Sequence, residues 1–159
     1  MVVDFDPQAN ATSALGIDPR SVEKSMYDVI LNDVNLRDCI IKSKWEFLSV
    51  APSNLDLAGA EIELVSAFNR ERLLDGAISS VISEFDFVLI DCPPSIGLLT
   101  VNALTAASEV LVPIQCEYLA LEGLGQLLSN VERVKTHLNK ELHISSIALF
   151  VMSLDLLFK

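Results

Sequence analysis

The sequence has little of what defines several large classes of protein. Its three cysteines are widely spaced and form no C-x-x-C pair, which argues against a disulfide framework or a cysteine zinc site and favours a reducing compartment. Lysine and arginine number 11 against 22 aspartate and glutamate residues, for a net charge of -11. Such an acidic stretch is a poor nucleic-acid-binding surface. We therefore expect a cytoplasmic protein whose DNA-binding surface, if the intact protein has one, lies outside this stretch.

A secretory leader and a membrane span are also not expected. Met1 is followed almost at once by Asp4, without a charged and then apolar segment, so we expect no secretory leader. The strongly apolar stretch 144–158 contains three serines and Asp155, and it is shorter than the about 18 to 20 residues that span a membrane. This stretch predicts a buried strand with an irregular tail, and we expect no contact with a membrane.

Glycine is scarce, and its pattern excludes one motif. No G-x-x-x-x-G-K-[ST] sequence occurs among the 159 residues, so the loop whose backbone N–H groups cradle nucleotide phosphates is missing. The pair Gly123 and Gly125 is too short a pattern and falls in an expected helix. It does not replace the phosphate loop.

What the sequence does contain is typical of a globular protein with a mostly parallel sheet. A hydrophobic content of 51% and a charged content of 21% over residues 1–159 suit a single α/β domain. Apolar runs rich in β-branched residues alternate with helical patterns, which favours βαβ units in a doubly wound sheet with flanking helices. Several runs are apolar on both faces, as expected of strands that helices cover on both sides.

The expected strands are Val2–Phe5, Phe47–Val50, Phe85–Ile90, Val110–Ile114 and Ile144–Val151. The expected helices are a short one over Met26–Leu31, one or two within Ala60–Ile82 and a long amphipathic one over Glu117–Leu138. The six prolines are expected at or beyond strand ends, where a missing N–H does least harm.

Carboxylates follow two of these apolar runs. Asp4 and Asp6 end the first run, and Asp91 ends the run that begins at Phe85. Because ligands of open α/β sheets bind at the carboxyl ends of the strands, these carboxylates are candidates for a common site. Taken singly, Asp4 and Asp91 could simply end strands and Asp6 could form a turn or a helix cap.

Three segments together resemble the ParA/Soj family of partition ATPases. The segments are Asp4-Phe5-Asp6-Pro7-Gln8-Ala9-Asn10, Asp91-Cys92-Pro93-Pro94-Ser95 and Gln115-Cys116-Glu117-Tyr118. The resemblance covers the chain from Met1 to about Ala148. It implies a P-loop NTPase-like fold of the deviant Walker A type that binds Mg-ATP and dimerises around the nucleotide. It also implies a centromere-binding ParB-type partner, non-specific DNA binding and association with the nucleoid.

The resemblance assigns roles to individual residues. Asp6 would be the catalytic residue that orients or activates the attacking water, and Asp4 and Asp91 would hold magnesium. Pro93 and Pro94 would form, with Ser95, the loop that senses the γ-phosphate, although the same residues could be a plain strand-to-helix turn. Gln115 would line the nucleotide site or the dimer face, or only pack. Phosphoryl transfer requires a hard cation, which carboxylates can bind, and a water molecule held in position.

The sequence also departs from the family. Members carry a Lys-Gly-Gly-x-Gly-Lys-Thr-Thr loop before the Asp-x-Asp-Pro-Gln motif, and after Asp155 they continue with segments that are not found here. We therefore expect a truncated ATPase domain that, by itself, neither hydrolyses ATP nor binds it tightly. The alternatives are a MinD-like membrane-associated ATPase and a non-catalytic remnant or interaction module.

Overall fold

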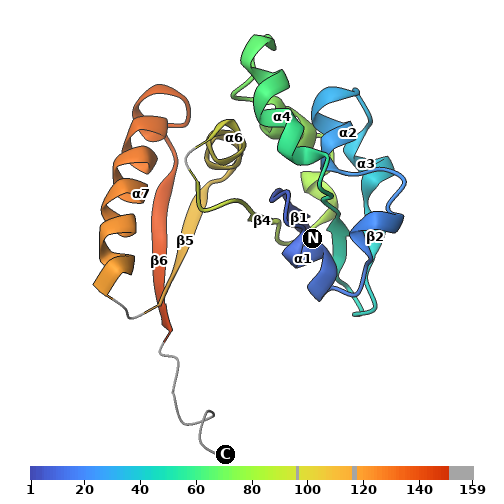
Figure 1. Ribbon diagram of the computed structural model, residues 1–159, viewed down its shortest axis with the longest axis horizontal. Coiled ribbons are helices and arrows are strands. Elements are labelled where there is room, and N and C mark those ends of the chain that lie inside the picture. Colours follow the sequence, from blue (N-terminus) through green and yellow to red (C-terminus); the bar gives the residue numbers. More distant parts are fainter. Residues whose placement is uncertain (96, 116–117, 151–159) are drawn as a thin grey trace, which may run out of the picture. The chain divides into compact units, whose positions relative to one another are not determined.

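The computed structural model describes residues 1–95, 97–115 and 118–150 of the chain. Clustering of contacts divides the chain into two compact units, Met1–Ala106 and Ala107–Lys159. Each unit is described by itself below (Figure 1). The expectation of a single domain over residues 1–159 stays a prediction.

The first unit is built on a four-stranded sheet with the order β2-β3-β1-β4. Its strands are β1 (Val2–Asp4), β2 (Ile41–Lys42), β3 (Ser49–Ala51) and β4 (Leu89–Asp91). β1 pairs in parallel with both β3 and β4, whereas β2 pairs antiparallel with β3. The predicted parallel sheet is confirmed in this unit, with a short antiparallel strand added at its edge.

Helices occupy most of the connections in the first unit. The α-helices are α1 (Asn10–Ala14), α2 (Met26–Leu31), α3 (Leu36–Cys39), α4 (Leu57–Glu63), α5 (Leu73–Ser79) and α6 (Leu98–Ala106), and the short 3₁₀ turns are η1 (Pro19–Ser21), η2 (Leu64–Ser66) and η3 (Ile82–Glu84). The predicted range of α2 is confirmed at both ends. Ser25 and Asp28 form a reciprocal capping box at its start. α4 and α5 fill the predicted helical region, although α4 begins earlier, at Leu57.

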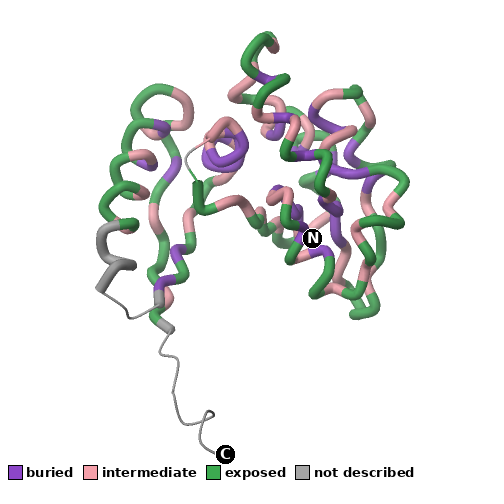
Figure 2. Tube along the Cα trace, in the orientation of Figure 1, coloured by how far each residue is buried: buried purple, intermediate pink, exposed green. Residues whose placement is uncertain are grey.

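The core of the first unit lies between the sheet and these helices. Phe5, Met26, Leu57, Leu64 and Leu74 are almost completely removed from solvent (Figure 2). Burial of each such side chain stabilises the fold by about 1.5 to 3 kcal/mol before entropy is counted. This packing fixes the end of β1, since Val3 and Phe5 flank Asp4 and both are fully buried.

The second unit contains two parallel strands and one long helix. They are β5 (Glu109–Gln115), α7 (Tyr118–His137) and β6 (His143–Phe150). β5, β6 and α7 confirm the predicted strands and the predicted amphipathic helix over the described residues. Glu117, the expected start of that helix, and Val151, the expected end of the last strand, lie outside the described residues. Val131 and Val134 form part of its buried side. No helix in the described part of the chain is both long and apolar enough to cross a bilayer.

Two details of the strands differ from the expectation. Pro113 lies inside β5, opposite Ala148, and not at a strand end. A proline is tolerated there because a strand with one described neighbour uses only alternate N–H groups in its ladder. The strands are also not covered on both faces, since Leu89, Leu111 and Leu149 are 62%, 60% and 67% exposed.

Candidate functional site

Asp4 and Asp91 are direct partners on adjacent strands. β1 and β4 run parallel with the register Val2 to Leu89, Val3 to Ile90 and Asp4 to Asp91. The next residue, Phe5, donates its backbone N–H to the carbonyl oxygen of Asp91 over 2.7 Å. The pairing therefore brings two of the predicted site residues to the same edge of the sheet, the carboxyl edge.

The carboxylate of Asp4 is buried and hydrogen-bonded. Its Oδ2 accepts hydrogen bonds from the backbone N–H and the hydroxyl of Thr12, each over 2.6 Å. Its Oδ1 accepts a longer bond of 3.3 Å from the N–H of Asp6. The Thr12 hydroxyl in turn accepts a bond of 3.0 Å from the N–H of Ser53, just beyond β3. Asp4 thus joins β1, α1 and the end of β3.

Asp6 forms a tight turn on the way to α1. Its Oδ1 accepts a bond of 2.9 Å from the N–H of Gln8, and its carbonyl accepts one of 2.9 Å from the N–H of Ala9. Ala9 has a φ of 53°, in the left-handed region, and directly precedes α1. Oδ2 of Asp6 accepts no hydrogen bond from the described residues. This half-buried carboxylate oxygen remains available to a water molecule or an ion.

The electrostatics of the edge favour a cation. Burial raises the pKa of Asp91 above its ordinary value, and the negative charges of Asp4 and Asp6 raise it further. Among the described residues, no ion pair involves any of these three carboxylates. Burial and the charges of Asp91 and Asp6 also raise the pKa of the neighbouring Cys92 thiol to about 11. Three carboxylates and a thiol that stays protonated make an acidic edge with no basic partner.

A metal at this edge would receive few protein ligands. In the described part of the chain, no group of three or more His, Cys, Asp or Glu side chains is arranged to enclose an ion. Oδ2 of Asp4 accepts two bonds from Thr12, whereas its Oδ1 accepts only the longer bond from the N–H of Asp6. Oδ1 of Asp4 and the carboxylate of Asp91 are therefore the donors with the most remaining capacity. Mg²⁺ commonly takes one or two carboxylates and keeps several waters, so the donor set fits magnesium better than it fits a fully enclosed ion.

The loop after β4 is fastened to α6. The hydroxyl of Thr100 donates to the carbonyl oxygens of Pro93 and Ser95, over 3.2 and 2.5 Å. At the end of the loop, the carboxylate of Glu61 from α4 approaches Gly97 so closely that a Cβ there would collide with it. Among the described residues, Oε1 of Glu61 is buried without a hydrogen-bond partner. Pro93 and Pro94 therefore lie in a loop that Thr100 of α6 holds and that ends close to α4.

Sequence reasoning placed some site residues and missed others. Asp4, Asp6 and Asp91 come together as expected, and Pro93 and Pro94 follow Asp91 in the same unit. Gln115 is the last residue of β5, in the other unit, and its side chain lies outside the described part of the structure. Neither Thr12 as a partner of Asp4 nor Ser53 as a partner of Thr12 was anticipated. The available signal was a threonine within the first turn after the acidic motif.

Comparison with known proteins supports a single family. The family model described as an AAA domain matches residues 1–144. The sporulation initiation inhibitor protein Soj of Bacillus subtilis is 49% identical over 96% of this chain, and the chromosome partitioning protein ParA of Myxococcus xanthus is 46% identical over 94%. The crystal structure of cobyrinic acid a,c-diamide synthase from Mycobacterium smegmatis with bound ADP and magnesium superimposes with a TM-score of 0.88, 41% identity and 93% coverage of this chain.

The chain is much shorter than these proteins. It spans 60% of the Bacillus protein, 53% of the Myxococcus protein and 60% of the solved mycobacterial chain. The matched part includes the acidic edge described above, since the family model starts at residue 1 and extends past β5.

Proposed function

This chain belongs to the ParA/Soj family of AAA-domain ATPases, and on that basis we propose that it carries the magnesium-and-water side of a partitioning ATPase site. In this proposal Asp4 and Asp91 hold Mg²⁺ and Asp6 orients the attacking water. The nucleotide is ATP, bound once a phosphate loop is supplied. The whole protein acts in chromosome or plasmid segregation.

The register pairing of Asp4 with Asp91 is the observation that carries the proposal. The pKa of Asp91 is raised first by burial and then by repulsion from Asp4 and Asp6, and a divalent cation would offset the repulsion. The choice of ligand rests on a solved relative, the mycobacterial cobyrinic acid a,c-diamide synthase. One structure of that protein is named with bound ADP and magnesium, and a second with a bound ATP analogue and magnesium. A bound Mg²⁺ would neutralise negative charge on the phosphates.

Each residue of the edge has a distinct task in the proposed site. Thr12 holds one oxygen of Asp4 fixed, and the other oxygen, which accepts the longer bond from the N–H of Asp6, is the one proposed to contact the metal. The turn from Asp6 to Ala9 fixes the Asp6 side chain through Gln8 while leaving one oxygen free to accept a hydrogen bond from water. Positioning of this kind supplies most of the catalysis in phosphoryl transfer.

The loop of Pro93 and Pro94 is proposed to report nucleotide state to the rest of the protein. Its restraint by Thr100 and its contact with α4 at Gly97 support that role. Gln115 is proposed to line the nucleotide site or the dimer face. Membership of the family is the basis on which we further propose a homodimer formed on ATP binding, a ParB-type centromere-binding partner, DNA binding and association with the nucleoid.

Calorimetric titration of Mg-ATP tests the proposal. The 159-residue chain should not bind. The same chain preceded by the phosphate-loop segment that family members carry before the Asp-x-Asp-Pro-Gln motif should bind, and it should lose most of its magnesium dependence when Asp91→Asn is introduced. Asp38→Asn, which removes a carboxylate from an exposed pair with Lys24, is the matched control and should bind normally.

Two results would contradict the proposal. The first is an extended protein that folds, as shown by circular dichroism, but does not bind Mg-ATP. The second is an Asp91→Asn variant with unchanged magnesium-dependent affinity, because the carboxylate pair would then have no part in metal binding.

A further inference from the structure

Glu61 stands on the side of α4 that packs on the core. Leu57, Ala60 and Leu64 are fully buried, and residue 61 is at the i+4 position from Leu57 and the i−3 position from Leu64, where an apolar side chain is expected. Glu61 instead brings a carboxylate whose Oε1 is buried and accepts no hydrogen bond within the described part of the chain. Because an unsatisfied buried oxygen lowers folding stability, this carboxylate calls for a reason other than stability.

The carboxylate of Glu61 occupies the space beside Gly97, the residue just before α6. A Cβ at residue 97 would collide with the carboxyl carbon and both carboxyl oxygens of Glu61. The φ of Gly97 is not in the left-handed region, so other residues could adopt its backbone conformation. The neighbouring carboxylate, and not the backbone, therefore requires glycine at this position.

Gly97 is linked to the loop that follows β4 through the first turn of α6. Its carbonyl oxygen accepts the N–H of Val101 over 3.0 Å. Thr100, in the same turn, donates its hydroxyl to the carbonyl oxygens of Pro93 and Ser95. A displacement of Gly97 would therefore move this turn and, with it, two carbonyl groups of the loop.

The helix that carries Glu61 is itself fastened to the acidic edge. Ser53, which precedes α4, donates its N–H to the hydroxyl of Thr12, and this hydroxyl donates to Asp4. Leu57, the first residue of α4, belongs to the core cluster of the unit. α4 therefore connects the acidic edge to the contact at Gly97 through buried structure.

We propose that Glu61 is a positioning residue for the loop of Pro93 and Pro94: its carboxylate sets the place of Gly97 and thereby keeps the loop in one arrangement beside the acidic edge. The carboxylate also lies close to the N-terminus of α6, where a helix favours negative charge. Glu61 is not among the proposed magnesium ligands and acts only through Gly97. What the loop senses rests on the proposed function, whereas the contact between Glu61 and Gly97 does not.

Urea denaturation of single and double variants of the 159-residue chain tests the contact. Gly97→Ala should raise the unfolding equilibrium constant by about fivefold, because the new Cβ displaces the carboxylate. In a Glu61→Ala background the same substitution should cost nothing, since the space beside residue 97 is then empty and alanine lowers the entropy of the unfolded chain. The two losses are therefore not additive.

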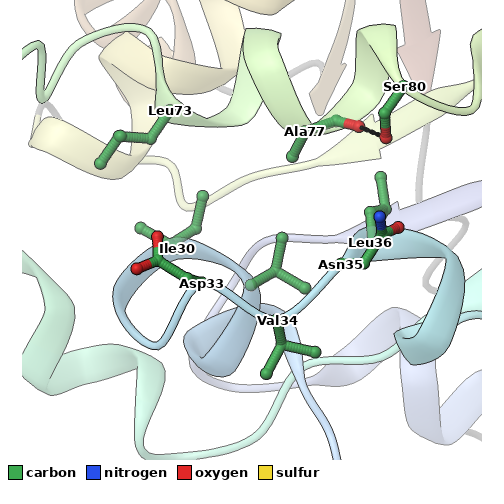
Figure 3. A pocket seen from close by; sticks show the side chains of 9 residues that line it. Ile30, Asp33, Val34, Asn35, Leu36, Leu73, Ala77 and Ser80 are labelled. Carbon is green, nitrogen blue, oxygen red and sulfur yellow. Dashed lines mark hydrogen bonds between the residues drawn. The ribbon is translucent and has the colours of Figure 1, made fainter.

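Gly76→Ala is the matched control for the glycine substitution. Gly76 lies inside α5, between Leu73 and Ala77, which line the pocket shown in Figure 3. No atom lies within 4 Å of the place that a Cβ at residue 76 would take, and alanine favours a helix. Gly76→Ala should therefore not destabilise the chain, with or without Glu61.

Hydrogen exchange followed by mass spectrometry tests the positioning itself. In Glu61→Ala, peptides that cover the loop after β4 and the first turn of α6 should exchange about fivefold faster or more. Peptides of β1 and β3 should exchange as in the wild type, whereas a general loss of stability would speed exchange throughout the unit. Glu61→Gln keeps the size but not the charge, so its loop should exchange at a rate between those of the wild type and Glu61→Ala.

Nucleotide preference in the chain extended by the phosphate-loop segment provides a third measurement. If Glu61 positions a loop that senses the γ-phosphate, Glu61→Ala should reduce the preference for Mg-ATP over Mg-ADP by about fivefold or more. The affinity for Mg-ADP should stay unchanged, because that nucleotide lacks the γ-phosphate. Calorimetry with each nucleotide gives both affinities.

Three outcomes would overturn the inference. They are additive losses for Glu61→Ala and Gly97→Ala, unchanged exchange of the loop in Glu61→Ala, and an extended Glu61→Ala protein that binds Mg-ATP with unchanged preference over Mg-ADP. An extended wild-type protein that binds no Mg-ATP contradicts the proposed function instead. The urea and exchange measurements then still decide whether Glu61 positions the loop.

Discussion

Thr12 gives both its backbone N–H and its hydroxyl to a single oxygen of Asp4, each over 2.6 Å. Both residues are completely buried, and the same hydroxyl accepts the N–H of Ser53. The acidic edge of the sheet is therefore not a set of free carboxylates. One of its members is held in place by a residue that links three segments of the unit.

Replacement of Thr12 should destabilise the first unit. Thr12→Val keeps the shape but removes the hydroxyl, so that Ser53 loses its acceptor and Asp4 loses a donor. We expect the free energy of unfolding to fall by about 1 to 3 kcal/mol, the cost of unsatisfied buried polar groups. Urea denaturation followed by circular dichroism measures this loss. Thr12→Ser retains the hydroxyl and should lose less; equal losses for both variants would show that the hydroxyl contributes nothing.

Asp91 should make stability depend on pH. Its pKa is raised in the folded chain by burial and then by Asp4 and Asp6, so its charged form is less favourable folded than unfolded. The contribution of the Asp91 carboxyl to folding stability is therefore fully present below its ordinary pKa of 3.8. It is lost as the pH rises through the higher pKa of the folded chain. Asp91→Asn should raise the melting temperature modestly at pH 7, and the gain should disappear below about pH 4. A gain that is the same at both pH values would contradict this origin.

Asn102 should be essential to the packing of α6. It is completely buried, its side-chain oxygen accepts the N–H of Leu74 over 3.2 Å, and its amide donates to the carbonyls of Arg70 and Leu98. Asn102→Leu leaves all three groups without this partner. We expect a loss of about 2 to 4 kcal/mol in unfolding free energy, measured by denaturant titration. The exposed amide of Asn130 on α7 is a suitable control, since Asn130→Leu should change stability little.

Cys39 and Cys92 should resist alkylation in the folded chain. Burial, and then the charge of Asp28, raises the pKa of Cys39 to about 12, and the pKa of Cys92 is raised to about 11. Since the thiolate is the reactive form, iodoacetamide at pH 8 should label both residues slowly until urea unfolds the chain. Mass spectrometry of the labelled peptides follows each site separately. Rapid labelling of Cys39 without denaturant would contradict its burial.

The fold was predictable where local signals were strong. The start of α2 follows from Ser25 and Asp28, which cap it within its own sequence. α6 was not predicted as a helix because its residues are apolar nearly all round, so no amphipathic period marks it. β2 is two residues long and α3 four, which is too short for a periodic pattern. Pro113 was misplaced because sequence alone does not show on which side a strand is paired.

The sequence by itself determined that carboxylates follow two apolar strands, because a buried strand must end where the chain turns polar, and this is encoded locally in Asp4, Asp6 and Asp91. It also carried the family motifs that identify the chain. Only the tertiary structure decided that Asp4 stands beside Asp91 and that Thr12 occupies one oxygen of Asp4. These relationships join residues far apart in the chain, and they depend on strand register and side-chain packing, which no local pattern specifies.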